Sequence, residues 1–469
     1  MESYDRLVEK WSPVLNEESS GKIADSHRRS VTAAVLENQE KAMFEQGMIN
    51  EVAGNAAGDG TSYTQAGGAG TGAATNWNPI LIALVRRAMP NLMAYDVCGV
   101  QPMTGPTGLI FAMRSQYKTP KVGGGAAGTE ALFNEAQTTY SGDSVHDEAN
   151  AGSHNSRGPS GLVGAADGAT SGVQDSSLVD SEGLFVPSVG VGMSTATAEA
   201  LGTGAGANTF HEMGFSIDKT SVVAKSRALK AEYTLELAQD LKAIHGLDAE
   251  TELANILSTE ILAEINREVI RTINSQAKIG SRQAGIQTAG IFDLATDADG
   301  RWSVEKFKGL LVQLERECNV IAKETRRGKG NFIICSSDVA TALTAAGMLD
   351  YSPALNTSLN VDDTGNTFAG VLNGRTKVYI DPYAVADYVT VGYKGTNPYD
   401  AGVFYCPYVP LQMVRAVGEN DFQPRIGFKT RYGMVSNPYS EGGSQLNEGL
   451  GSARQNQYYR IFRVDNILA

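Results

Sequence analysis

Glycine-rich and charged stretches are the first places to look for chemistry in this 469-residue sequence. The run GGGAAG, Gly123 to Gly128, fits the GxGxxG pattern of dinucleotide-binding turns. That pattern binds a pyrophosphate when it directly follows a strand and opens a helix. Here Thr119 and Pro120 precede the glycines and no compact βαβ unit follows. A soluble nucleotide-binding enzyme that uses this run and Arg326 therefore stays only as an alternative hypothesis.

Two other stretches favour structural roles over ligand binding. The sequence RRGKG, Arg326 to Gly330, offers charges for a phosphate, but a basic helix end followed by glycine is typical of C-terminal capping. The stretch DLATDADG resembles a calcium loop. Alignment on Gly300 puts Ala295 at the first ligand position and Lys306 where a bidentate glutamate belongs. We predict a surface turn there.

Metal, covalent and redox chemistry lack the usual residue patterns. No HExxH, GxSxG or GxxxxGK[ST] motif occurs, so we predict no enzyme, no catalytic residue, no cofactor and no metal. The cysteines form no CxxC pair, which favours free thiols; they are Cys98, Cys318, Cys335 and Cys406. The histidines have no ligand spacing with another His or Cys and are predicted to be solvated or hydrogen-bonded; they are His27, His146, His154, His211 and His245.

Charge and hydropathy narrow the class of protein further. The net charge of −13 opposes broad binding to a polyanion, so sequence-specific nucleic-acid binding is disfavoured. The start MESYDRLVEKW lacks the basic and apolar regions of a secretion signal. The apolar run PILIALV stops at Arg86, well short of the roughly 20 residues that span a bilayer. We therefore expect a soluble protein without a membrane span.

The first part of the chain changes character abruptly near residue 50. Residues 1–47 predict two helical pieces broken near NEESSG, with a thin apolar stripe of Val31, Ala34 and Val35 that packs weakly by itself. From 52 to 78 the sequence is Gly, Ala, Thr and Asn, which predicts an extended arm that needs a partner. Residues 119–211 are again rich in Gly and Ser and are interpreted as a loose insertion.

A strand pair is predicted on either side of this insertion. The stretch TGLIFAMRSQY alternates Leu109, Phe111 and Met113 with polar or small residues. Beyond the insertion, one long strand is predicted from Met213 to Thr234, with polar residues frequent on both faces. Such a strand fits a projecting hairpin better than a core sheet.

The second half of the chain, from residue 235, completes an α+β protein without regular βαβ alternation. The clearest helix, 249–273, has apolar residues stepping by four, a stripe that Ile256 and Leu262 widen. Its charged face is expected to pair Glu264 with Arg267 and Glu268 with Arg271. A second helix is predicted at 304–323, a strand and a helix follow it, and after residue 375 the pattern is mostly strand. The apolar positions of the first long helix are Leu253, Leu257, Ile261, Ile265, Val269 and Ile273. Those of the second are Phe307, Leu310, Leu311, Leu314, Cys318 and Ile321.

Several long strings make the sequence resemble the major capsid proteins of T-even-type tailed phages, including phages of cyanobacteria. The strings that carry the resemblance are VRRAMPNLMAYDVCGVQPMTGPTG (85–108), EMGFSIDKTSVVAKSRALKAEYTLELAQDLKAIHGLDAE (212–250), EINREVI (264–270), GNFIICS, VYIDPYA, VGYKG and FQPRIGFKTRYGM (422–434). They extend over most of the chain outside 52–78 and 119–211.

This resemblance implies the Hong Kong 97-type capsid fold. The implied parts are a cleavable scaffold-facing segment at 1–51, an N-terminal arm at 52–78, the start of a peripheral domain at 79–106, an extended hairpin at 107–234 with an insertion domain at about 119–211, the peripheral spine helix within 235–283, an axial domain at 284–396, and peripheral strands with the C-terminus at 397–469.

The resemblance also implies a function in assembly. Many copies would form hexamers of a phage head in the virion, built in the host cytoplasm, that encloses double-stranded DNA without reading its sequence. The implied partners are a vertex capsid protein, an internal scaffold protein, a prohead protease, a portal and possible decoration proteins. The alternative within the same fold is the paralogous vertex protein, which forms pentamers.

Processing is the one site that the resemblance assigns. Relatives of this kind lose an N-terminal segment to a protease that cuts after Glu, with an aliphatic residue two positions earlier. Ile49 and Glu51 supply that pattern, so the cut is expected between Glu51 and Val52. Gly47 and Gly54 disfavour a helix on either side and favour the extended backbone that a protease binds.

Overall fold

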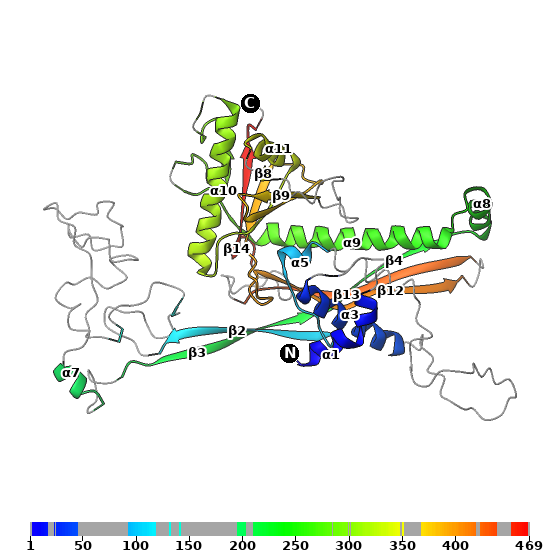
Figure 1. Ribbon diagram of the computed structural model, residues 1–469, viewed down its shortest axis with the longest axis horizontal. Coiled ribbons are helices and arrows are strands. Elements are labelled where there is room, and N and C mark those ends of the chain that lie inside the picture. Colours follow the sequence, from blue (N-terminus) through cyan, green and yellow to red (C-terminus); the bar gives the residue numbers. More distant parts are fainter. Residues whose placement is uncertain are drawn as a thin grey trace. The chain divides into compact units, whose positions relative to one another are not determined.

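A computed structural model gives the fold, and Figure 1 labels its elements. The structure describes residues 2–16, 23, 25–45, 92–118, 131–132, 140–141, 195–202, 210–283, 285–298, 300, 302–347, 349–350, 367–418, 423–438 and 452–467. The chain divides into two compact units, one made of residues 1–110 with 220–469 and the other of residues 111–219.

A four-stranded sheet forms one part of the larger unit. Its order is β1 (Gly99–Val100), β12 (Val403–Val417), β13 (Pro424–Ser436) and β4 (Lys225–Glu232). The first pair is parallel and the other two are antiparallel. Aromatic side chains such as Tyr405 and Phe428 are buried on this sheet because alternate residues of each strand point to the same face.

The long helix α9 (Ala249–Gln276) packs on β4 and β13 of this sheet (Figure 1). The side chain of Asp248 caps its first turn by accepting a hydrogen bond from the Glu250 N–H at 3.3 Å. The predicted stripe is confirmed from Ile261 to Ile273, where every fourth residue is buried. Ile256, by contrast, is 61% exposed, so its prediction as part of the stripe was wrong.

The expected ion pairs within α9 were also wrong. Glu264 and Glu268 pair with Arg227 of β4, and Arg267 pairs with Asp381. Tertiary partners replace the local i,i+3 pairs because the helix lies between two sheets that supply opposite charges.

The second sheet is mixed and larger. Its order is β5 (Ala277–Ile279), β14 (Asn456–Asp465), β11 (Tyr388–Gly392), β7 (Phe332–Cys335), β10 (Thr376–Ile380), β9 (Thr367–Leu372) and β8 (Leu349–Asp350), while β6 (Ile291–Asp293) also pairs with β14. Helix α10 (Ser303–Thr325) packs on β14 and β11, and α11 (Ser337–Ala345) packs on β10. Sheets of mixed direction joined by irregular connections confirm the α+β prediction.

Three N-terminal helices belong to the same unit: α1 (Glu2–Lys10), α2 (Ser12–Leu15) and α3 (Ser26–Glu45). Two helical regions were predicted and are confirmed. The thin stripe was an underestimate, because all six residues of α3 from Val31 to Leu36 are buried. Helix α3 packs on α1 at one side and on β12 at another (Figure 1).

A two-stranded ribbon joins β2 (Thr107–Tyr117) to β3 (Met213–Val223). The single long strand predicted from Met213 to Thr234 is in fact two strands. The chain leaves the ribbon at Ala224 and continues as β4 in the four-stranded sheet. Three further helices are α5 (Ala94–Val97), α7 (Thr195–Glu199) and α8 (Leu235–His245).

Candidate functional site

The ribbon carries an apolar face. Hydrogen bonds from the Lys118 N–H to the Glu212 carbonyl and from the Ala224 N–H to the Pro106 carbonyl, both 2.9 Å, show that the strands are antiparallel. In that register residues opposite each other have numbers of the same parity, so the odd-numbered residues of both strands share one face. Six large apolar side chains on it are more than half exposed, and we call them the ribbon face: Leu109, Phe111, Met113, Met213, Phe215 and Ile217.

The opposite side of the ribbon is polar. Arg114 pairs with Asp218 at 3.5 Å, and the Lys118 ammonium pairs with Glu212 at 2.6 Å. Polar residues do occur on both faces of β3, as predicted: Ser216, Asp218 and Thr220 at even positions and Lys219 and Ser221 at odd ones. The apolar ribbon face is therefore limited to the half of β3 that contains Met213, Phe215 and Ile217.

Helix α8 (Leu235–His245) is a second exposed apolar surface. Thr234 caps its start and Gly246, with a φ of 66°, ends it, so its boundaries are well specified. None of its residues is buried, and Leu235, Leu237 and Ile244 are each at least half exposed. A helix with this composition is stabilised when another surface covers it.

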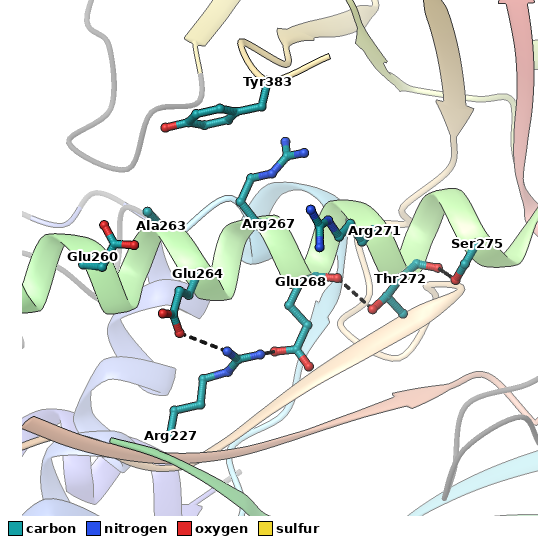
Figure 2. Close-up of a pocket in the computed structure, with 10 residues that line it drawn as sticks. All are labelled: Arg227, Glu260, Ala263, Glu264, Arg267, Glu268, Arg271, Thr272, Ser275 and Tyr383. Carbon is teal, nitrogen blue, oxygen red and sulfur yellow. Dashed lines mark hydrogen bonds and ion pairs between the residues drawn. The ribbon is translucent and has the colours of Figure 1, made fainter. Parts of the chain in front are cut away.

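An open cleft of about 820 Å³ lies along α9 (Figure 2). Arg227 reaches it from β4 and donates hydrogen bonds to Glu264 at 3.0 Å and to Glu268 at 2.6 Å. The Tyr432 hydroxyl also donates to Glu268, and burial together with this bond raises the pKa of Tyr432. The lining residues are Arg227, Glu260, Ala263, Glu264, Arg267, Glu268, Arg271, Thr272, Ser275 and Tyr383.

The far side of the cleft is held in a similar way. Arg267 donates to the buried carboxylate of Asp381 at 2.5 Å, and its guanidinium lies 5.1 Å from the centre of the Tyr383 ring. Charged groups in this cleft thus neutralise each other and tie α9 to strands on both sides. The hydroxyls of its lining are engaged by the helix itself, since Thr272 donates to the Glu268 carbonyl at 2.7 Å and Ser275 to the Thr272 carbonyl at 2.9 Å.

The predicted processing site, made of Ile49, Glu51 and Val52, lies outside the described residues. The same holds for Gly123–Gly128, His146 and His154.

The charged stretches have structural roles, as predicted. Arg326 ends α10 in the left-handed conformation with a φ of 54°, and its N–H donates to the Ala322 carbonyl at 3.0 Å. Asp293 accepts hydrogen bonds from the Ala295 N–H and from Asn466 in a turn. Within the described residues no three His, Cys, Asp or Glu side chains gather as metal ligands do.

The four cysteines are buried free thiols, which confirms their prediction. Burial raises the pKa of the Cys98 thiol to about 12, so it stays protonated at neutral pH and is a poor nucleophile. None of the helices in the described ranges combines the length and apolar character that crossing a bilayer requires.

The described surfaces thus include an apolar ribbon face, an exposed helix α8 and a cleft in which Arg227 and Arg267 are ion-paired. The family model described as "Major capsid protein Gp23" matches residues 74–464. The chain belongs to this family of phage major capsid proteins.

Individual relatives agree with the family. The chain is 38% identical to the "Major capsid protein" of Enterobacteria phage T4 over 98% of both chains, and 42% identical to that of Salmonella phage ViI over 93% of this chain and 90% of the relative. The "Capsid vertex protein" of phage T4 is 30% identical over 48% of this chain and 53% of its own length. The major capsid proteins thus match more strongly than the vertex protein.

A solved structure titled "Mycobacterium phage Bobi" aligns with 80% of this chain and 91% of its own, at 10% identity and a TM-score of 0.36.

Proposed function

We propose that this chain assembles into hexamers that tile a closed phage head around double-stranded DNA, with the Hong Kong 97-type fold. In this proposal the four-stranded sheet with α9 is the peripheral domain and α9 its spine helix. Most of the eight-stranded sheet with α10 and α11 is the axial domain, implied at 284–396, although its strands β5 and β14 come from segments that the resemblance implied to be peripheral. The ribbon is the extended hairpin that reaches an adjacent subunit.

The ribbon face is the observation that carries this proposal. Six large apolar side chains on one face of a two-stranded ribbon are unfavourable in water, and burying each against a neighbour would contribute roughly 1.5–3 kcal/mol. A two-stranded sheet is also marginal by itself. A subunit with such a ribbon gains stability when neighbouring copies cover it, which favours a lattice.

Electron microscopy of the purified chain tests the assembly. We expect sixfold capsomers or closed particles in which the ribbon face of each copy contacts another copy. A particle with the ribbon face open to solvent contradicts the proposal. The vertex capsid protein, the internal scaffold protein, the prohead protease, the portal and decoration proteins are the further partners of this proposal.

Proteolytic maturation is the second part of the proposal, with the cut between Glu51 and Val52. It removes ten acidic and six basic residues, a net charge of −4, and leaves −9 of the original −13. Less negative charge then faces the incoming DNA, although salt screens this effect beyond about 10 Å. Mass spectrometry of mature particles is expected to find a chain that begins at Val52, and Glu51→Ala is expected to retain residues 1–51. Mature wild-type particles with Met1 still present contradict the cut.

A further inference from the structure

The N-terminal segment, described at residues 2–16, 23 and 25–45, packs on the body of the protein and contributes to its core. Leu15 and Val35 are completely buried, and Trp11 and Leu36 nearly so. All four belong to the hydrophobic cluster that also contains Leu92, Met93 and residues of α9 and β12. A surface helix normally buries one stripe, whereas α3 is enclosed by α1 on one side and by the body on another.

Polar contacts fix the position of α3 on the body. The Asn38 side chain donates to the Met103 carbonyl at 2.6 Å, and Gln39 donates to the Leu411 carbonyl at 3.2 Å. Both bonds are buried, and a shift of α3 by one residue would break them.

A third contact fixes the direction of the helix. Near the start of α3, Arg28 donates to the Asp96 carboxylate at 2.6 Å, and its guanidinium lies 5.7 Å from the centre of the Tyr95 ring. Apolar burial in the middle of α3 and directional bonds at both ends are the features of a peptide helix in a receptor groove.

None of these contacts depends on the peptide bond between Glu51 and Val52. The anchors of the segment end at Gln39, and their partners begin at Leu92. Cutting the chain between the two sets changes their covalent connection and leaves the contacts themselves intact.

We infer that the surface formed by residues 92–103 and β12 is a binding site for a helical segment, and that it retains residues 2–45 after the cut, an inference that rests on the processing proposed above. The partner that fits this site is the chain's own α3 as a separate peptide. Release of the segment is then a separate step after proteolysis, and it is this step that uncovers the apolar surface of β12.

The test uses the full chain with a specific protease sequence inserted between Glu51 and Val52. The purified protein is cut by the added protease, and the N-terminal fragment is followed by size-exclusion chromatography and mass spectrometry at about 1 µM, where a typical peptide–groove affinity keeps it bound. We expect the fragment to elute with residues 52–469. A fragment that elutes alone immediately after cutting, while circular dichroism shows a folded body, overturns the inference.

Matched variants show whether the described contacts hold the fragment. Leu36→Asp places a charge in the core and is expected to release the fragment at least about 100-fold faster. Ser26→Asp adds the same charge at an exposed position of α3 and is expected to leave release unchanged. Asn38→Ala is the milder variant, with about tenfold weaker retention. Equal release for wild type, Leu36→Asp and Asn38→Ala contradicts the assigned site.

The outcomes separate this inference from the proposed processing. Immediate release of the fragment contradicts the proposed retention and does not bear on the proposed cut between Glu51 and Val52. Mature particles that lack a chain beginning at Val52 remove the natural cut, whereas the engineered cut still measures retention.

Discussion

The N-terminal segment and the ribbon differ in where they place their apolar side chains. Both carry apolar side chains on elements that are too slight to fold alone. Helix α3 buries its apolar residues inside its own chain, with Val35 completely buried. The ribbon presents its own to the outside, with Phe215 67% exposed.

The difference shows that burial within one chain does not follow from the amount of apolar sequence. Helix α3 alone has fewer large apolar residues than the ribbon yet is enclosed from two sides, whereas the ribbon leaves its apolar face open. The apolar residues of α3 are covered by other parts of the same chain. Under the proposed function, the ribbon face is covered only when a second copy binds.

The largest effect is expected from a substitution in the core of α9, because this core supports the body on which α3 packs and from which the ribbon extends. Ile265→Asp buries an unpaired charge in α9 and is expected to lower the free energy of unfolding by about 4 kcal/mol or to prevent folding. The matched control is Ile256→Asp, because Ile256 lies on the same helix and is mostly exposed. Urea unfolding measures both. Equal loss in the two variants would contradict the orientation of α9.

A direct contrast between the two regions comes from the same substitution in each. Val35→Asp is expected to cost about 3 kcal/mol of segment docking, which limited trypsin digestion at Arg28 and Arg29 would reveal. Phe215→Asp is expected to leave urea unfolding of the unassembled chain within about 0.5 kcal/mol of wild type, since exposed sites tolerate charge.

Assembly should respond in the reverse order. Phe215→Asp is expected to reduce particle formation in sedimentation experiments because it interrupts the ribbon face. A Phe215→Asp chain that assembles normally would remove the ribbon face from the proposed interface.

The smallest expected effect is the pH dependence of the free energy of unfolding that a buried cysteine causes. Cysteines occur in the body and in neither the N-terminal segment nor the ribbon, so this effect reports on the body. Burial raises the pKa of the Cys406 thiol from 9.0 to about 12. The folded state therefore keeps a proton that the unfolded state loses above pH 9. The stabilisation is complete below pH 9 and is lost as the pH rises toward 12, about 1 kcal/mol by pH 10.

Cys406→Ala tests this dependence. Its unfolding free energy should fall less steeply than that of wild type between pH 9 and pH 10 in urea titrations. Parallel curves for the two proteins would contradict the role of this buried group.

Much of the body was predictable because its patterns are local. Apolar residues at helical spacing indicated α9 and α10, and short strand-like runs between Asn-Pro and Gly turns indicated the strands after Arg375. The exposed Ile256 shows the limit, since periodicity alone does not say where along a helix the partner sheet ends. Burial of α3 was missed for a related reason: Ala33 and Thr32 are small and become buried only because neighbours approach from two sides.

The candidate surfaces were less predictable. Phe111 and Phe215 share a face only through a pairing between strands that lie about 100 positions apart in the sequence. Arg227 meets Glu264 and Glu268, which lie 37 and 41 positions further along the chain, because β4 leaves the ribbon and enters a different sheet. Long-range pairing of this type has no local signal.

The break at Ala224 makes one residue the link between the ribbon and the four-stranded sheet. Directly after it, β4 pairs with β13 from Lys225 opposite Tyr432 to Glu232 opposite Arg425, and Arg227 of the same strand pairs with Glu264 and Glu268 of α9. If neighbouring copies hold the ribbon as proposed, a load on β3 would therefore reach a strand that is fastened to both a sheet and a helix.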